Sequence, residues 1–144
     1  MEIQKIDKSH YKSIVYISHP FQNNPENVKE IEDIIKGLRR RFPDYLFISP
    51  VHAFGFLYNS TTYEQGLYMT LFLLETCADE MWVFGKDWRN STGVKAEIEY
   101  CKKRNIPYYV WGTSKSLSPV ESQFLSHMEF LSHMEKTLKG RLEL

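Results

Sequence analysis

The stretch Ser13-Ile14-Val15-Tyr16-Ile17-Ser18 combines β-branched and aromatic residues and runs directly into the polar loop that starts at His19. A short apolar run of this length, bounded by turn residues, is typical of a buried strand. We therefore expect a first strand here, with the loop after it at the carboxyl edge of a sheet. The elements that follow decide which kind of sheet this strand joins.

Helices and strands alternate after this first strand. Asn24-Pro25-Glu26 provides an N-cap, a proline at the first helical position and an acid in the first turn, and predicts a helix to about Arg41. The further elements are expected as a strand over Tyr45–Ser49, an aromatic loop over Pro50–Asn59, a helix over Thr61–Cys77, a strand over Met81–Gly85, a polar loop over Lys86–Ser91, a helix over Gly93–Arg104, a strand within Ile106–Trp111 and a long helix from Ser118.

This βαβαβαβα order predicts an α/β fold. We expect a single doubly wound, Rossmann- or flavodoxin-like parallel sheet of four to five strands, with right-handed crossovers and helices on both faces. The chain has 144 residues, of which 42% are hydrophobic, and this is enough apolar material for one core. One domain over residues 1–144 is therefore expected.

Composition excludes several classes of partner. Lysine plus arginine equals aspartate plus glutamate at 18 each, so no net field attracts a nucleic acid polymer or an acidic membrane. The longest apolar run, around Tyr68–Leu74, is far shorter than the roughly 20 residues that span a bilayer. Cys77 and Cys101 lack CxxC spacing and a preceding secretory signal. The expectation is a cytoplasmic protein with two buried thiols.

Metal binding is not expected. The last helix carries a six-residue duplication that places His127 and His133 far apart around the helix, with no carboxylate or cysteine completing a ligand set.

The segment Ser91-Thr92-Gly93-Val94-Lys95-Ala96-Glu97 is the candidate site. In doubly wound sheets ligands bind beyond the carboxyl ends of the strands, and this segment leads from such a loop into a helix. Hydroxyls and a glycine at a helix start let backbone N–H groups approach an anion such as a phosphate. One turn further, the carboxylate of Glu97 is suited to attack a sugar carbon through an oxocarbenium-like state. An ordinary capped helix with a solvated Glu97 is the alternative.

These residues resemble the nucleoside 2-deoxyribosyltransferase superfamily, in the pattern Ala78-Asp79 before a strand and Ser91-x-Gly93-x-x-x-Glu97-x-x-Tyr100 after it. The segments Val15–Pro20 and Phe47–Phe54 are similar to the phage and bacterial branch known as DUF4406. The similarity extends from about Ser13 to Trp111.

The resemblance implies an N-glycosidase or deoxyribosyltransferase without a cofactor. Glu97 would attack the anomeric carbon, the base would leave, and water or a second base would resolve the glycosyl enzyme. Members acting on nucleoside 5′-monophosphates carry a serine where Ser91 stands, which implies a phosphorylated ligand contacted by Ser91, Gly93 and Ser18. Tyr16 resembles the tyrosine that positions the nucleophile.

One position departs from the family pattern. Active members carry an aspartate that assists protonation of the leaving base, and this chain has Leu71 there. Loss of a general acid costs on the order of a hundredfold in rate, unless His52, His19 or Tyr63 replaces it. A structural role for His52 is the alternative to an acid.

Three aromatic rings are candidates for covering the base or ribose. Phe21, Phe54 and Trp88 lie in or beside the loops at the strand ends, although packing of the core or of a dimer is the alternative for such rings. A homodimer or larger assembly is expected, with the last helix as its interface. Besides the enzyme, a nucleotide-binding or sensing module without catalysis and a purely structural dimer stay open.

Overall fold

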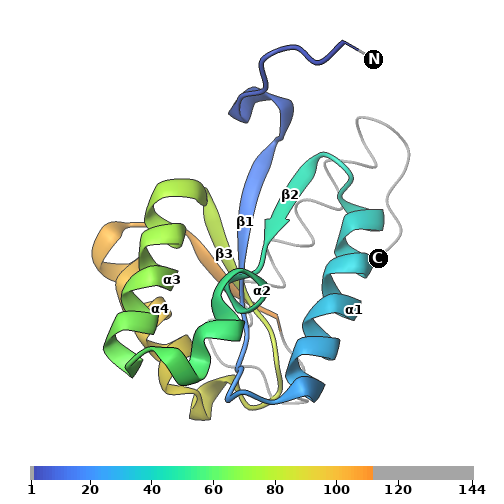
Figure 1. Cartoon of the computed structure of the whole chain (residues 1–144). Helices are drawn as coiled ribbons and strands as arrows, with labels where there is room; N and C mark the ends of the chain where they lie inside the picture. Colours follow the sequence, from blue (N-terminus) through green and yellow to red (C-terminus); the bar gives the residue numbers. More distant parts are fainter. Residues whose placement is uncertain (1, 112–144) are drawn as a thin grey trace.

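The computed structural model describes residues 2–111 of the chain. The helix expected from Ser118, with His127 and His133, lies outside these residues. Four parallel strands form one sheet in the order β2-β1-β3-β4 (Figure 1), namely β1 (Ser13–Ser18), β2 (Tyr45–Ile48), β3 (Glu80–Val83) and β4 (Tyr108–Val110). All six residues of β1 are buried, as expected of an inner parallel strand. The predicted α/β fold with a single parallel sheet is confirmed.

Four α-helices connect and follow these strands, each with a side-chain N-cap. They are α1 (Pro25–Arg41), α2 (Pro50–Phe54), α3 (Tyr63–Cys77) and α4 (Thr92–Arg104), and the caps are Asn24, Ser49, Thr62 and Ser91. Short 3-10 helices occur at η1 (Lys8–His10), η2 (Gly55–Ser60) and η3 (Trp88–Asn90). The expected loop over 50–59 is thus helical, because Ser49 caps α2 and Pro50 occupies its first turn.

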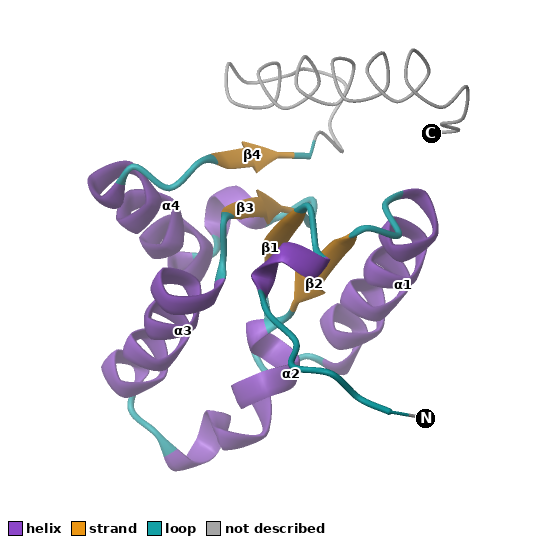
Figure 2. Ribbon diagram, turned by 90° about the horizontal axis from the view of Figure 1, so that it is seen from above, coloured by secondary structure: helices purple, strands orange, loops and turns teal. Residues whose placement is uncertain are grey.

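Helices cover both faces of the sheet, since successive residues of a strand point to opposite sides. Val15 and Ile17 of β1 pack with Ile31 of α1, whereas Tyr16 packs with Leu74 of α3 and with residues of α4. Figure 2 shows α1 on one side of the sheet and α3 and α4 on the other. The two clusters together make the core.

The strand order reverses between β1 and β3. The chain passes from β1 to β2 on one side and then crosses to β3 on the other side of β1, where Ser18 pairs with Val83. The loops that leave β1 and β3 therefore diverge at the carboxyl edge of the sheet, where α/β folds of this kind bind ligands.

No helix in residues 2–111 is long and apolar enough to cross a membrane. Both cysteines are free thiols, and Cys101 is buried as expected, while Cys77 is only half-buried.

Gly85 closes the turn after β3, and a substitution there tests how closely the loops after β1 and β3 pack. Its φ is +100°, and an added Cβ would lie 2.8 Å from Pro20 Cδ in the loop after β1. We expect Gly85→Ala to lower the free energy of unfolding by about 1 to 3 kcal/mol, because it combines backbone strain with a steric clash. Denaturant unfolding followed by tryptophan fluorescence measures this change.

Gly37→Ala is the matched control, because a Cβ at this helical position meets nothing within 4 Å. It should raise stability by about 0.5 to 1 kcal/mol. Equal effects of the two substitutions would contradict the close packing of the two loops.

Candidate active site

A cavity of about 570 Å³ lies at the carboxyl edge of the sheet. Its walls come from the loop after β1, from α2 and η2, from the first half of α3 and from the start of α4. These segments are far apart in sequence, and the switch in strand order brings them together. Among residues 2–111, no lysine and no arginine line the cavity.

Glu97 of α4 lies at the wall of this cavity and is only 6% exposed. Its Oε1 accepts a hydrogen bond of 2.9 Å from Ser18 Oγ, and its Oε2 accepts one from the Tyr16 hydroxyl. Tyr16 and Ser18 lie two residues apart on β1, so their side chains point to the same face. The carboxylate is therefore held from both oxygens by one strand.

Burial raises the pKa of Glu97 from its ordinary 4.5 to about 7, and the bonds from Tyr16 and Ser18 oppose this rise. Burial, and next the charge of Glu97, raises the pKa of Cys101 to about 12. A carboxylate that ionises near neutrality in a cavity can act as a nucleophile or as a base.

Six of the predicted site residues line the cavity, and two more lie directly behind it. Tyr16 and Ser18 are the two that hold Glu97 from behind. The lining residues are His19, Phe21, Phe54, Ser91, Gly93 and Glu97. Ser91 Oγ also caps α4 by accepting from Val94 N at 3.3 Å. A Cβ at Gly93 would meet nothing within 4 Å, so this position leaves open space at the start of α4.

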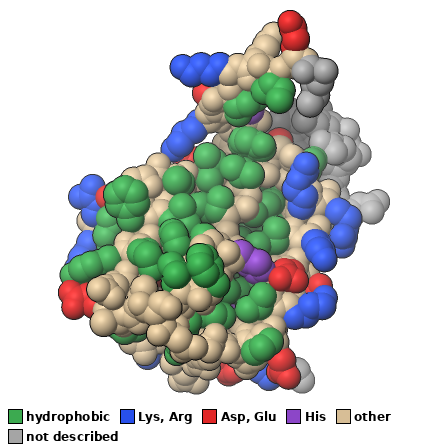
Figure 3. Space-filling model, in the orientation of Figure 1, with side chains coloured by type: hydrophobic (Ala, Val, Ile, Leu, Met, Phe, Trp, Pro, Cys, Tyr) green, Lys and Arg blue, Asp and Glu red, His purple; other side chains and the backbone are tan. Residues whose placement is uncertain are grey.

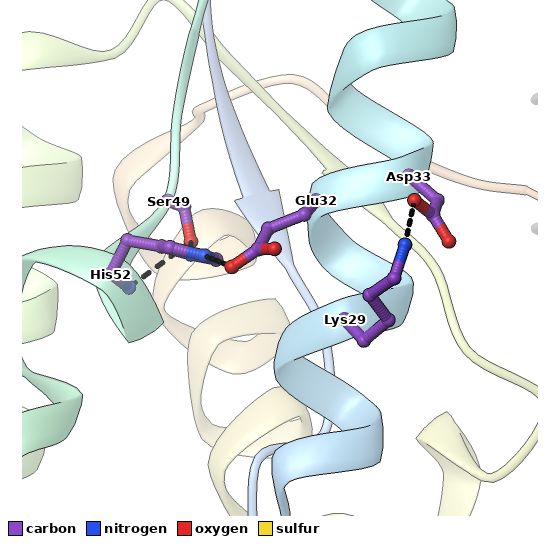
Figure 4. Close-up of polar contacts among 5 residues, drawn as sticks. All are labelled: Lys29, Glu32, Asp33, Ser49 and His52. Atoms are coloured by element: carbon purple, nitrogen blue, oxygen red, sulfur yellow. Dashed lines mark hydrogen bonds and ion pairs between the residues drawn. The ribbon is translucent and has the colours of Figure 1, made fainter.

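His52 does not line the cavity. Its Nδ1 lies 2.8 Å from Ser49 Oγ and its Nε2 lies 2.9 Å from Glu32 Oε2, as Figure 4 shows. These contacts tie α2 to α1 and occupy both ring nitrogens. These contacts support a structural role for His52. Its role as a catalytic acid stays a prediction, because His52 does not line the cavity.

Trp88 is also placed away from the cavity. It is half-buried against the core cluster of Tyr16 and Val94, and the Arg89 guanidinium lies 4.7 Å from its ring centroid. These contacts support the packing alternative for Trp88, and its role in covering a base or ribose stays a prediction.

On α3, Thr70 lines the cavity and the neighbouring Leu71 does not. Leu71 packs against the core, whereas Thr70 lines the cavity together with Tyr63 and Gly66. Sequence reasoning missed this residue. A small residue and a hydroxyl four positions apart in an apolar helix, Gly66 and Thr70, were the available signal.

His19 lines the cavity and is buried. Its Nδ1 lies 2.7 Å from the Pro20 carbonyl oxygen and therefore donates to it. Its Nε2 lies 3.4 Å from Glu30 Oε1, within ion-pair distance but without the geometry of a hydrogen bond. Among residues 2–111, the buried Nε2 of His19 is thus left without a hydrogen-bond partner.

Two further residues of the sequence pattern hold the fold together around the site. Asp79 Oδ2 accepts from Ile14 N at 2.8 Å, and Tyr100 donates to Glu75 Oε1 at 3.0 Å. The first bond fixes the start of β1, and the second joins α4 to α3. Across residues 2–111, no group of three or more His, Cys, Asp or Glu side chains could hold a metal ion.

One protein-family model matches a part of the chain that contains the whole site. A family model described as "Domain of unknown function (DUF7768)" matches residues 13–111, which include the whole sheet and every residue that lines the cavity. No curated protein and no solved structure matches the chain.

The raised pKa of Glu97 makes stability depend on pH. The folded state binds this proton more tightly than the unfolded chain, so stability falls as pH rises from about 4.5 through about 7. Glu97→Gln removes the titration and should be more stable than the parent at pH 8 by up to about 3 kcal/mol. At pH 5 the two proteins should differ much less.

Glu99→Gln, two residues along α4 at an exposed position, serves as the control in chemical unfolding at both pH values. It should show no comparable dependence. A Glu97→Gln variant that loses stability equally at pH 5 and pH 8 would contradict the burial of an ionising carboxyl.

Proposed function

The chain belongs to the DUF7768 family, and we propose that it cleaves or exchanges the N-glycosidic bond of a nucleoside or nucleoside 5′-monophosphate, with Glu97 as nucleophile. The observation that carries this proposal is the buried Glu97 carboxylate, bonded to Tyr16 and Ser18 at the wall of a cavity. A carboxylate so placed stabilises and then traps an oxocarbenium-like sugar carbon.

The reaction proceeds in two displacements. A carboxylate oxygen of Glu97 forms a bond to C1′ while the C1′–N bond breaks, and its electron pair stays on the base nitrogen, which takes up a proton. Water or a second base then attacks C1′ and gives up a proton, and the Glu97 carboxylate is released. Tyr16 and Ser18 hold the carboxylate in both steps, because each bonds to a different oxygen.

The aromatic wall supports a planar base as ligand. Phe21 and Tyr58 pack edge to face with ring centroids 5.5 Å apart, and both line the cavity. Phe21 also packs on Gly55, where an added Cβ would lie 3.2 Å from Phe21 Cζ. Such rings bury the faces of a nucleobase well.

A 5′-phosphate would sit at the start of α4. Ser91, Thr92 and Gly93 line the cavity there, and the positive end of the helix dipole favours an anion. Because the cavity wall within 2–111 has no lysine or arginine, the helix start would supply most of the attraction. A test of this function therefore needs both nucleosides and nucleoside 5′-monophosphates as substrates.

The second candidate is a nucleotide-binding or sensing module without turnover. The feature that favours it is Leu71, which stands where the family pattern has an aspartate and packs against the core, while the neighbouring Thr70 at the cavity wall is far too weak an acid to protonate a leaving base. A ligand that raises the melting temperature without being consumed would support this candidate.

The enzyme proposal predicts base release that depends on Glu97 and on pH. With ribo- and deoxyribonucleosides and their 5′-monophosphates, kcat/KM should rise with pH and level off above a midpoint near 7, as Glu97 ionises. Glu97→Gln should lose at least about a thousandfold in kcat. Chromatography of the free base measures both effects.

Glu99→Gln is again the control and should keep the parent rate. Base release by Glu97→Gln at the parent rate would refute the assignment of the nucleophile.

The last helix, expected as the interface, lies outside residues 2–111, and we propose that α3 also contributes to the interface of a homodimer. Tyr68 and Phe72 are 63% and 70% exposed and lie one turn apart, and Leu74 is the one fully buried residue of this apolar helix. Figure 3 shows hydrophobic side chains spread across the face on which α2 and α3 lie. A helix that is apolar on most sides is normally covered on most sides.

Phe72→Glu should therefore convert a dimer into a monomer in light scattering at micromolar concentration, because it places a charge within an apolar contact. Ile6→Glu changes a residue that is 61% exposed but lies outside α3, and it should leave the dimer intact. A parent protein with a monomeric mass would contradict the proposal.

A further inference from the structure

The loop after β1 contains two neighbouring residues with a left-handed backbone. Gln22 and Asn23 each have a φ of 51°, and they form the centre of a tight turn in which Asn24 N donates to Phe21 O at 3.0 Å. Asparagine adopts this conformation more readily than most residues, because its short side chain can bond to the local backbone. Glutamine has no such advantage, so the backbone of Gln22 is strained.

Contacts on both sides hold this turn in place. Asn27 Nδ2 of α1 donates to Phe21 O at 2.9 Å, so this carbonyl oxygen accepts two hydrogen bonds. On the other side the Phe21 ring packs edge to face with Tyr58 and lies against Gly55. Strained residues persist where their surroundings fix the conformation, and they cluster at functional sites. The strain beside the cavity therefore indicates a role for the Gln22 side chain.

Gln22 lines the cavity next to Phe21, whereas Asn23 does not. Among the lining residues within 2–111, Gln22 has the only amide side chain, and this amide forms no hydrogen bond with another described residue. The hydroxyls of Thr61 and Thr70, by contrast, donate to nearby backbone carbonyl oxygens at 3.1 and 2.9 Å. A planar amide offers a donor and an acceptor side by side, and in Gln22 both are available to a ligand.

We propose that Gln22 selects the base of the ligand, by pairing its amide with a base edge that presents an exocyclic amino or carbonyl group beside a ring nitrogen. This inference rests on the proposed function, because it assigns the base-binding part of the same cavity. A base that lies against the rings of Phe21 and Tyr58 presents its edge to Gln22, which follows Phe21 in the chain. The glutamine amide binds adenine, for example, through two hydrogen bonds. A base without the exocyclic group accepts only one of them.

The test compares the binding of adenosine with that of purine riboside, which lacks only the 6-amino group, and repeats it with their 5′-monophosphates. Equilibrium dialysis of the Glu97→Gln protein, which should not consume the ligands, should give an adenosine dissociation constant about tenfold lower. Adding Gln22→Gly should bring the two constants within about twofold of each other. Adding Asn23→Gly is the matched control, because it changes the other residue with a φ of 51° and should keep the tenfold ratio. Glycine favours positive φ, so neither change should lower the melting temperature.

Base release by the protein with Glu97 intact separates this inference from the proposed function. Equal binding of adenosine and purine riboside, a ratio that Gln22→Gly leaves unchanged, or an equal loss of the ratio in Asn23→Gly overturns the role of Gln22. A ratio that depends on Gln22, without base release from any substrate, upholds this role and refutes the proposed reaction. Base release with a ratio that does not depend on Gln22 does the reverse, and a lack of binding by all four compounds together with a lack of base release refutes both.

Discussion

The burial of the Glu97 carboxylate against two hydroxyl groups of β1 is the constraint on which the site depends. A buried carboxylate costs free energy unless donors satisfy it, and within residues 2–111 its donors are Tyr16 and Ser18. These donors share a face because residues of a strand alternate, and Ile17 between them packs toward α1. A shift of the β1 register by one residue would point Tyr16 and Ser18 away from Glu97 and place an apolar side chain beside the carboxylate.

This constraint also explains why the site lies where the strand order reverses. β1 is an inner strand paired with β2 and β3, so its carboxyl end opens between two diverging loops. The helix after β3 then directs Glu97 back toward β1, and the segments after β2 close the cavity with aromatic rings. Within residues 2–111, no lysine or arginine lines the cavity, so the two hydroxyls offset only part of the free energy that burying the carboxylate charge costs. The pKa of Glu97 therefore stays near neutral.

Much of this arrangement could be predicted from sequence. The apolar run of β1, the Asn24-Pro25 start of α1 and the Ser91 start of α4 are local signals, and the three elements that they predict are present. The family resemblance predicted that Tyr16 positions Glu97, and the structure has this contact, whereas Ser18 was expected to contact a phosphate and instead donates to Glu97. His52, Trp88 and Thr70 could not be placed, because the direction of a side chain at a helix end or within an apolar helix is set by tertiary packing. The His52 ring contacts Glu32 on α1, which lies 20 residues earlier in the sequence. No local sequence pattern encodes such a contact.

The most direct test of the account is a search for a covalent sugar on Glu97. The protein is incubated with arabinosyl nucleosides, and their 5′-monophosphates, that carry fluorine at C2′, which slows hydrolysis of a glycosyl ester by destabilising its oxocarbenium-like transition state. Intact mass spectrometry and peptide mapping should then find one fluoropentosyl group on the peptide containing Glu97, and none in Glu97→Gln. An unmodified Glu97 with every base tested, or an adduct on another residue, would contradict the account.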